Sequence, residues 1–326
     1  MNQLKSLFNL LIFSGKKSTF FFLGVLLFLS YCATVPTQIV QHKFHPVLTV
    51  KEFAPKEKTL LPAIVLYEPV LLKDTVLFRT EDKKEKGLIP FFLKNGYTVY
   101  LISSKETFPS FRNHALEFDS ILNQIAEKQR EREIYLGGVS LGGQAVLEYM
   151  TIPSSLENQA RVSKIFFIGT GIDYNYSNSF TEHSTKKNYE ETFVKDICPK
   201  GSKDNFCKRY IRFNNELQNM DNREKETFFD RIPKLKNDFL TRFHKTKLQL
   251  GYFLIYGKLD SISPEESIFP FFDKIRSSSK MDSSNRMFEA SEANGQSIDY
   301  DHADLFLYPD VEKEVYRRLL YWLKRI

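Results

Sequence analysis

Five short apolar runs, separated by segments with helical character, constrain the fold of this chain more than any other feature. They lie at Pro62–Tyr67, Tyr97–Ile102, Glu133–Gly138, Lys164–Ile168 and Gln249–Tyr256. Continuous apolar runs of this length are typical of strands that are buried on both faces of a sheet. Strands that alternate with helices predict an α/β fold, with a mainly parallel central sheet and helices on both faces.

Apolar residues at helical spacing, with glycine or proline at the ends, indicate the connecting helices. We expect helices over Glu81–Asn95, His114–Lys128 and Leu141–Met150, one from Pro264, and a last one over Asp310–Ile326. A short strand over Arg286–Ala290 should complete the sheet. These elements divide the body into two parts of one core, residues 61–172 and 248–326.

The first 32 residues resemble an export signal. Basic residues and no acidic ones precede or border an apolar run of 11 residues, Thr19–Leu29, which is shorter than the roughly 20 residues of a membrane-spanning helix. Cys32 follows this run as in the lipobox of bacterial lipoproteins, although Tyr31 stands where that motif has a small residue. We therefore expect a lipid anchor on Cys32 and a place in the cell envelope. An ordinary cleaved signal and an uncleaved signal anchor are the alternatives.

Two further segments interrupt the regular alternation. Residues 33–60 form a tether, Ala33–Gln41, and the first strands, whereas residues 173–247 contain only charged, helix-like pieces and are expected to form a cap or lid insertion. Cys198 and Cys207 in this insertion would close a disulfide loop in an oxidising compartment, and two independent thiols are the alternative. Phenylalanines of the insertion would line an acyl pocket or attach the cap to the body.

The charge distribution argues against a nucleic-acid partner. The net charge of +6 includes three lysines of the leader, and the remaining basic and acidic residues are nearly balanced. Such a balance gives only a weak electrostatic footprint for a polyanion. The sequence also has no metal-ligand spacing and no phosphate-binding glycine loop, so we expect neither a metal nor a cofactor.

The strongest chemical motif is Gly138-Val139-Ser140-Leu141-Gly142. A β-type run leads into it and a run of helix formers follows it. A serine at such a sharp strand-to-helix turn adopts strained backbone angles, and small neighbours allow the turn to close. The helix N-terminus then directs N–H groups toward negative charge on a substrate oxygen. This context favours a nucleophile, and a glycine-rich turn without activity is the alternative.

A nucleophilic serine needs a base, and the base needs an orienting acid. Of the six histidines, only His302 lies after the last expected strand, and the others are His42, His45, His114, His183 and His244. Asp260 follows the strongest apolar strand, and Asp173 is the rival acid. The chain order serine, aspartate, histidine is that of α/β-hydrolases.

Over most of residues 60–326 the chain resembles the α/β-hydrolase superfamily, through GGVSLGG at 137–143, YGKLDSISPEES at 256–267 and DHADLF at 301–306. The resemblance implies Ser140 as nucleophile, Asp260 as acid and His302 as base. Residues 66–77 and 95–103 look closer to the branch of polyhydroxyalkanoate synthase-like enzymes and related lipases, whose synthases use cysteine where this chain has serine.

The resemblance also implies an oxyanion hole. One N–H would come from Leu141, and the other from Val70, because Pro69 has no N–H. Many relatives have His-Gly where this chain has Glu68-Pro69, so the usual loop geometry is in question.

We therefore expect an exported serine hydrolase that cleaves carboxylic esters, with acyl lipids as the favoured substrates because a lipid-anchored enzyme meets them at high local concentration. An acyltransferase or thioesterase on the same triad is the first alternative. A catalytically inactive surface lipoprotein is the second, and Glu68-Pro69 is the feature that supports it.

Overall fold

The structure is a computed structural model, and the residues that it describes all belong to one compact unit, Thr37–Ile326. They are residues 38–42, 47–55, 57, 59–69, 77, 86–106, 110–129, 133–153, 161–172, 239–243, 250–260, 262–278 and 284–325. The expected signal with Cys32 and most of the expected insertion, including Cys198 and Cys207, lie outside these residues. The lipid anchor, the disulfide and the cap therefore stay predictions.

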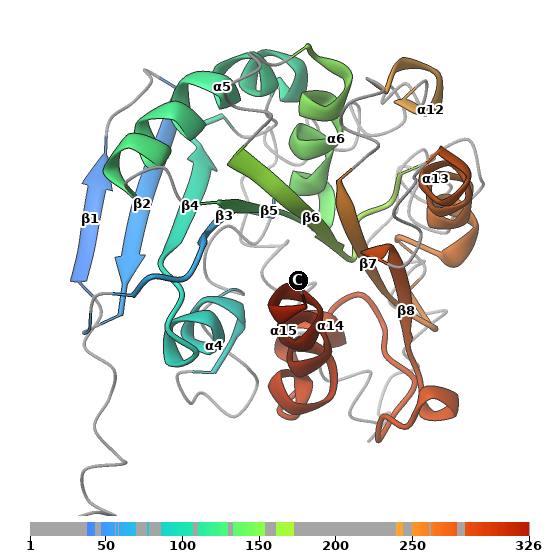
Figure 1. Ribbon diagram of the computed structural model, residues 1–326. Coiled ribbons are helices and arrows are strands. Elements are labelled where there is room, and N and C mark those ends of the chain that lie inside the picture. Colours follow the sequence, from blue (N-terminus) through green and yellow to red (C-terminus); the bar gives the residue numbers. More distant parts are fainter. Residues whose placement is uncertain are drawn as a thin grey trace, which may run out of the picture. The chain divides into compact units, whose positions relative to one another are not determined.

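An eight-stranded sheet forms the centre of this unit (Figure 1). Its strands are β1 (Gln38–His42), β2 (Leu48–Ala54), β3 (Ala63–Tyr67), β4 (Val99–Ser104), β5 (Ile134–Val139), β6 (Val162–Ile168), β7 (Gly251–Gly257) and β8 (Arg286–Ala290). They lie in the order β1-β2-β4-β3-β5-β6-β7-β8. Every neighbouring pair from β4 to β8 is parallel, whereas β1 and β2 are antiparallel additions at one edge. The predicted mainly parallel sheet is confirmed.

The first strand corrects one boundary. The sequence predicts a tether over Ala33–Gln41, but Gln38–His42 is strand β1 and pairs with β2 from Gln38 opposite Ala54 to His42 opposite Val50. The polar composition of this segment gives no apolar alternation to indicate a strand. Its backbone is ordered by hydrogen bonding to β2 instead, which a composition argument does not detect.

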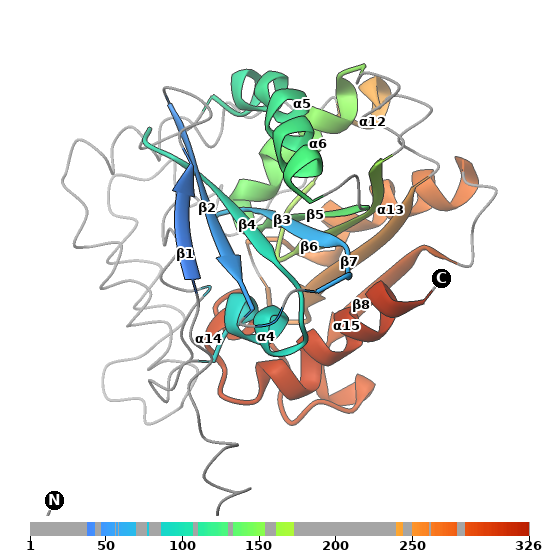
Figure 2. The same ribbon diagram turned by 60° about the vertical axis from the view of Figure 1, so that its left-hand side comes forward.

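Helices cover both faces of the sheet, as Figure 2 also shows. Helices α5 (Phe111–Lys128), α6 (Gly143–Thr151) and α13 (Glu265–Ser278) contribute to one apolar cluster. Helices α4 (Leu88–Lys94), α14 (Asp304–Leu307) and α15 (Arg317–Lys324) contribute to the other. The central strands supply alternate residues to the two clusters: in β3, Val65 faces the first and Ile64 and Leu66 face the second. This period of two is the pattern of a strand buried on both sides.

The helix predictions agree with the structure in position and differ at the ends. Helix α5 begins at Phe111 rather than at His114, and the expected last helix consists of a π-helical turn, Glu312–Tyr316, followed by α15. Short α14 is not predicted, because its four residues are fewer than the pattern of a helix requires.

One short helix of the expected insertion is described, α12 (Phe239–Arg242). Phe243, which follows it, is buried and lies 5.1 Å from the ring of Phe271 in α13, measured between ring centroids. At this position the aromatic ring attaches the insertion to the body, as one of the two interpretations of these phenylalanines predicts.

Within the described part of the chain, no helix is both long and apolar enough to span a membrane.

The connections between β3, β4 and β5 define one position at the carboxyl ends of the parallel strands. The connection from β3 to β4 carries α4 on one face, and the connection from β4 to β5 carries α5 on the other face. The strand order therefore reverses between β3 and β5. In open α/β sheets, ligand sites lie outside the carboxyl ends of the strands at such a reversal. Glu68 follows β3 and Ser140 follows β5 at this point.

Candidate active site

Ser140 lies at the sharp turn between β5 and α6, in a short 3-10 segment, Ser140–Gly142. Its φ angle of 50° lies in the left-handed region, and among the described residues no other non-glycine residue has a positive φ. A non-glycine residue with backbone angles in that region costs roughly 1–3 kcal/mol of free energy, so the surrounding packing must hold Ser140 in this conformation. The expected strained turn at Ser140 is confirmed.

Glycine at position 142 is required by the packing of this turn. A Cβ added to Gly142 would lie 1.9 Å from the backbone oxygen of Glu68, which no shift of a side chain relieves. A Cβ on Gly138 would lie 2.6 Å from the Cα of Gly143. The turn thus packs against the first residue of α6, Gly143, and against Glu68, which follows β3.

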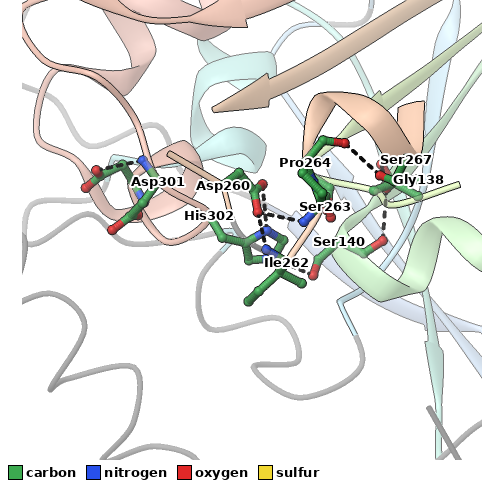
Figure 3. A network of polar contacts seen from close by, with 12 residues as sticks. Gly138, Ser140, Asp260, Ile262, Ser263, Pro264, Ser267, Asp301 and His302 are labelled. Atoms are coloured by element: carbon green, nitrogen blue, oxygen red, sulfur yellow. Dashed lines mark hydrogen bonds and ion pairs between the residues drawn. The ribbon is translucent and has the colours of Figure 1, made fainter. Parts of the chain in front are cut away.

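Ser140, His302 and Asp260 come together, as Figure 3 shows. The Ser140 Oγ lies 2.8 Å from Nε2 of His302, and Nδ1 of the same ring lies 2.9 Å from Oδ2 of Asp260. A carboxylate oxygen accepts, so Nδ1 carries the proton and Nε2 accepts the hydroxyl hydrogen of Ser140. This arrangement prepares the imidazole to take the serine proton.

Asp260 is held by its own loop. It is 2% exposed, and its Oδ1 accepts the backbone N–H groups of Ile262 at 3.0 Å and Ser263 at 2.8 Å (Figure 3). One carboxylate oxygen is therefore fixed by the backbone while the other remains for His302. The rival acid, Asp173, lies outside the described residues.

Gly169 and Thr170, which follow β6, support the site, and the sequence does not predict them. The Thr170 hydroxyl donates to the backbone oxygen of Ser140 at 2.9 Å, so it holds the strained turn from the loop that follows the neighbouring strand β6. Gly169 has a φ of 57°, and a Cβ there would lie 3.1 Å from Cε1 of His302. The Ser263 hydroxyl donates to the Gly169 oxygen at 2.8 Å. Their position directly after a parallel strand is the only signal in the sequence that points to them.

The expected oxyanion hole is described in part. Leu141 directly follows Ser140 and is half-buried, whereas Val70 lies outside the described residues. Glu68 is buried, its backbone oxygen lies against Gly142, and its carboxylate accepts the Ser103 hydroxyl at 2.7 Å. The chain after β3 is therefore fixed beside the turn, and the donors themselves stay a prediction.

A second histidine, His114, has similar partners at the end of β3. The Tyr67 hydroxyl lies 2.7 Å from Nδ1 of His114, and Nε2 of His114 lies 3.2 Å from Oε2 of Glu106. Burial raises the pKa of the Tyr67 phenol well above its usual value, and the negative charges of Glu68 and Glu106 raise the pKa further. The phenol is thus neutral and donates to His114.

In the described part of the chain, no group of three or more His, Cys, Asp or Glu residues is placed to hold a metal ion. The residues that surround Ser140 are those of proton transfer and nucleophilic attack.

No protein-family model matches the chain, and no curated protein matches it. Among solved structures, a bromoperoxidase from Bacillus anthracis is 17% identical with a TM-score of 0.55, and the match covers 88% of this chain and 100% of that one. An esterase from Exiguobacterium antarcticum is 12% identical with a TM-score of 0.52, over 89% of this chain and 100% of that one.

A Pyrococcus furiosus esterase is likewise 12% identical with a TM-score of 0.52, over 89% of this chain and 90% of that one. The chain has the α/β-hydrolase fold. At such identities the similarity extends to the fold alone. The nearer resemblance to polyhydroxyalkanoate synthase-like enzymes stays a prediction.

Proposed function

We propose that the protein is a serine hydrolase that cleaves carboxylic esters through an acyl intermediate on Ser140. One observation carries the proposal: the hydroxyl of a serine at a left-handed strand-to-helix turn lies 2.8 Å from a histidine nitrogen, and the other nitrogen lies 2.9 Å from a buried carboxylate. These are the relations that a nucleophile, a base and an orienting acid require.

The steps follow from this geometry. His302 takes the Ser140 proton as Oγ attacks the ester carbonyl, and Asp260 stabilises the imidazolium that forms. The Leu141 N–H and a second donor after Pro69 would stabilise the tetrahedral oxyanion. His302 then protonates the leaving alcohol. A water molecule, deprotonated by His302, then attacks the acyl carbonyl. The bond between the acyl carbon and Oγ breaks, the carboxylic acid leaves, and His302 returns the proton to Oγ of Ser140.

Acyl lipids are our first substrate class, and the cell envelope is the proposed location. The basic and apolar leader with Cys32 supports export and a lipid anchor. Two of the solved structures above are named esterases and one a bromoperoxidase, and because one fold hosts several activities, the site rather than the fold argues for ester cleavage.

An acyltransferase or thioesterase would use the same three residues. In an acyltransferase, an acceptor alcohol replaces water in the second step. A thioesterase would favour a thioester over the matching oxygen ester. A catalytically inactive module would lack turnover with every substrate.

A panel of p-nitrophenyl esters from acetyl to palmitoyl tests the proposal on the full chain, beside matched thioesters. We expect ester turnover that Ser140→Ala removes, with the highest kcat/KM on long acyl chains. Product that appears only with added alcohol would indicate acyl transfer, and a preference for thioesters would indicate a thioesterase. Equal rates for wild type and Ser140→Ala, or no turnover at all, would contradict the proposal.

A further inference from the structure

We propose that Asp304, together with Asp301, is a positioning residue that holds His302 in reach of Ser140; this inference rests on the function proposed above. The Asp301 N–H donates to Oδ2 of Asp304 at 3.1 Å, and the Asp304 N–H donates to Oδ1 of Asp301 at 2.7 Å. These reciprocal bonds close a ring around the intervening His302 and Ala303. We call this pair the aspartate clasp.

The clasp is buried, so its bonds are not exchanged with water. Asp301 is 3% exposed and Asp304 is 0% exposed. Burial of two carboxylates costs free energy unless hydrogen bonds compensate for it, and truncation of one partner leaves the other uncompensated. Two carboxylates that are buried in this way therefore serve the structure of the turn that carries His302.

The turn that carries His302 has little regular structure of its own. It leads into α14, which is only four residues long, Asp304–Leu307. Such a short helix fixes few backbone angles, so the orientation of His302 depends on other contacts. A displacement of about 1 Å in a reacting group is enough to lower a rate by about 10²-fold.

The rest of the loop is already attached to the acid side of the site. The Tyr300 backbone oxygen accepts the N–H of Leu259 at 2.9 Å, directly before Asp260. The Tyr300 hydroxyl donates to Glu314 at 2.8 Å. Residue 300 is thus fixed relative to Asp260, and the clasp fixes the next four residues. Together they determine where the imidazole of His302 lies between Asp260 and Ser140.

The test measures the rate at which a fluorophosphonate labels Ser140 in the full chain, with kcat and KM on the best ester. We expect Asp304→Ala to lower the labelling rate and kcat by about 10–100-fold with KM nearly unchanged, because His302 is misplaced while Ser140 and its turn are unchanged. Asp304→Asn keeps an acceptor oxygen for the Asp301 N–H and should recover most of the rate.

Asp273→Ala is the matched control, since Asp273 is exposed on α13 and pairs only at the surface with Arg276. Thermal unfolding of every variant shows that the rates are measured on folded protein. If Asp304→Ala does not fold, Asp301→Ala removes the reciprocal bond and is expected to give the same loss of rate.

Folded variants of the clasp that label as fast as wild type would overturn this inference and leave the proposed function intact. A rate that Asp304→Asn fails to restore would also overturn it, because the hydrogen bonds would then not be the cause. No labelling of wild type would instead contradict the proposed function, and the inference with it.

Discussion

His302 and His114 are both buried, and each lies between a hydroxyl group and a carboxylate. For His302 the partners are Ser140 at 2.8 Å and Asp260 at 2.9 Å. For His114 they are Tyr67 at 2.7 Å and Glu106 at 3.2 Å. The two networks contain the same kinds of groups at similar distances, so distances alone do not separate a site of chemistry from a structural contact.

The hydroxyl groups differ in their surroundings. Ser140 is only half-buried at a strained turn, and the helix N-terminus follows it. Tyr67 is 1% exposed in the core, where burial raises the pKa of its phenol well above the usual value. A substrate carbonyl could therefore approach the Ser140 hydroxyl but not the Tyr67 hydroxyl, which also remains neutral.

The carboxylates differ in their support. Asp260 is buried and accepts two backbone N–H groups, so its orientation is fixed. The Glu106 side chain is 41% exposed. Solvent screens an exposed partner, and such pairs contribute little. A fixed acid with an accessible hydroxyl makes the His302 network suitable for catalysis, whereas the His114 network holds the end of β3.

The largest effect should separate the two hydroxyl groups. We expect Ser140→Ala to lower kcat by about 10⁴–10⁶-fold, because the nucleophile is lost. Tyr67→Phe keeps the ring in the core and should leave kcat within a few-fold of wild type. Steady-state ester hydrolysis measures both, and an equal loss in the two variants would remove the distinction between the networks.

The next largest effect on kcat should separate the two carboxylates, Asp260 and Glu106. Asp260→Asn is expected to lower kcat by about 10⁴-fold, because the amide favours the wrong tautomer of His302. Glu106→Gln at the exposed position should change kcat little. Kinetics on the same ester, with circular dichroism to verify folding, would test this pair. A larger loss for Glu106→Gln would contradict the assignment of the acid.

His114 should affect stability rather than catalysis. His114→Leu removes the acceptor of the buried Tyr67 hydroxyl, and an unsatisfied buried donor costs about 1–3 kcal/mol. We expect the free energy of unfolding in urea to fall by that amount while kcat stays near wild type. A loss of kcat without a loss of stability would instead place His114 in the reaction.

The smallest effect should appear at alkaline pH. The folded-state pKa of Tyr67 is raised above the usual value of 10.0, so the unfolded chain loses this proton first as the pH rises. The contribution of Tyr67 to stability is therefore complete below about pH 10 and decreases above it. Urea unfolding at neutral and alkaline pH should show a smaller pH-dependent loss for Tyr67→Phe than for wild type. Equal losses would indicate that the phenol ionises normally in the fold.

The sequence predicts the parallel strands, the positions of the longer helices and the three residues Ser140, Asp260 and His302. Ser140 and Asp260 come soon after strands whose apolar pattern is clear, and His302 lies between the last expected strand and the last expected helix. It does not predict Thr170, which contacts Ser140 from the loop after β6, 30 residues further along the chain. Such contacts depend on strand order, which periodicity does not encode.

The two histidines show the same limit. The sequence predicts His114 only as the start of a helix, and its contact with Tyr67 joins residues 47 positions apart. The reciprocal bonds of Asp301 and Asp304 are local, and the spacing of two acids around His302 could have indicated them. Local capping is thus accessible to sequence analysis, whereas contacts between distant elements require the fold.

The measurement that tests the central claim most directly is covalent labelling of the full chain with a fluorophosphonate, followed by mass-spectrometric mapping of the modified residue. We predict one label on Ser140 that is absent in Ser140→Ala and retained in Tyr67→Phe. Folded wild-type protein that takes up no label, or a label that persists in Ser140→Ala, would contradict the assignment of Ser140 as an activated nucleophile.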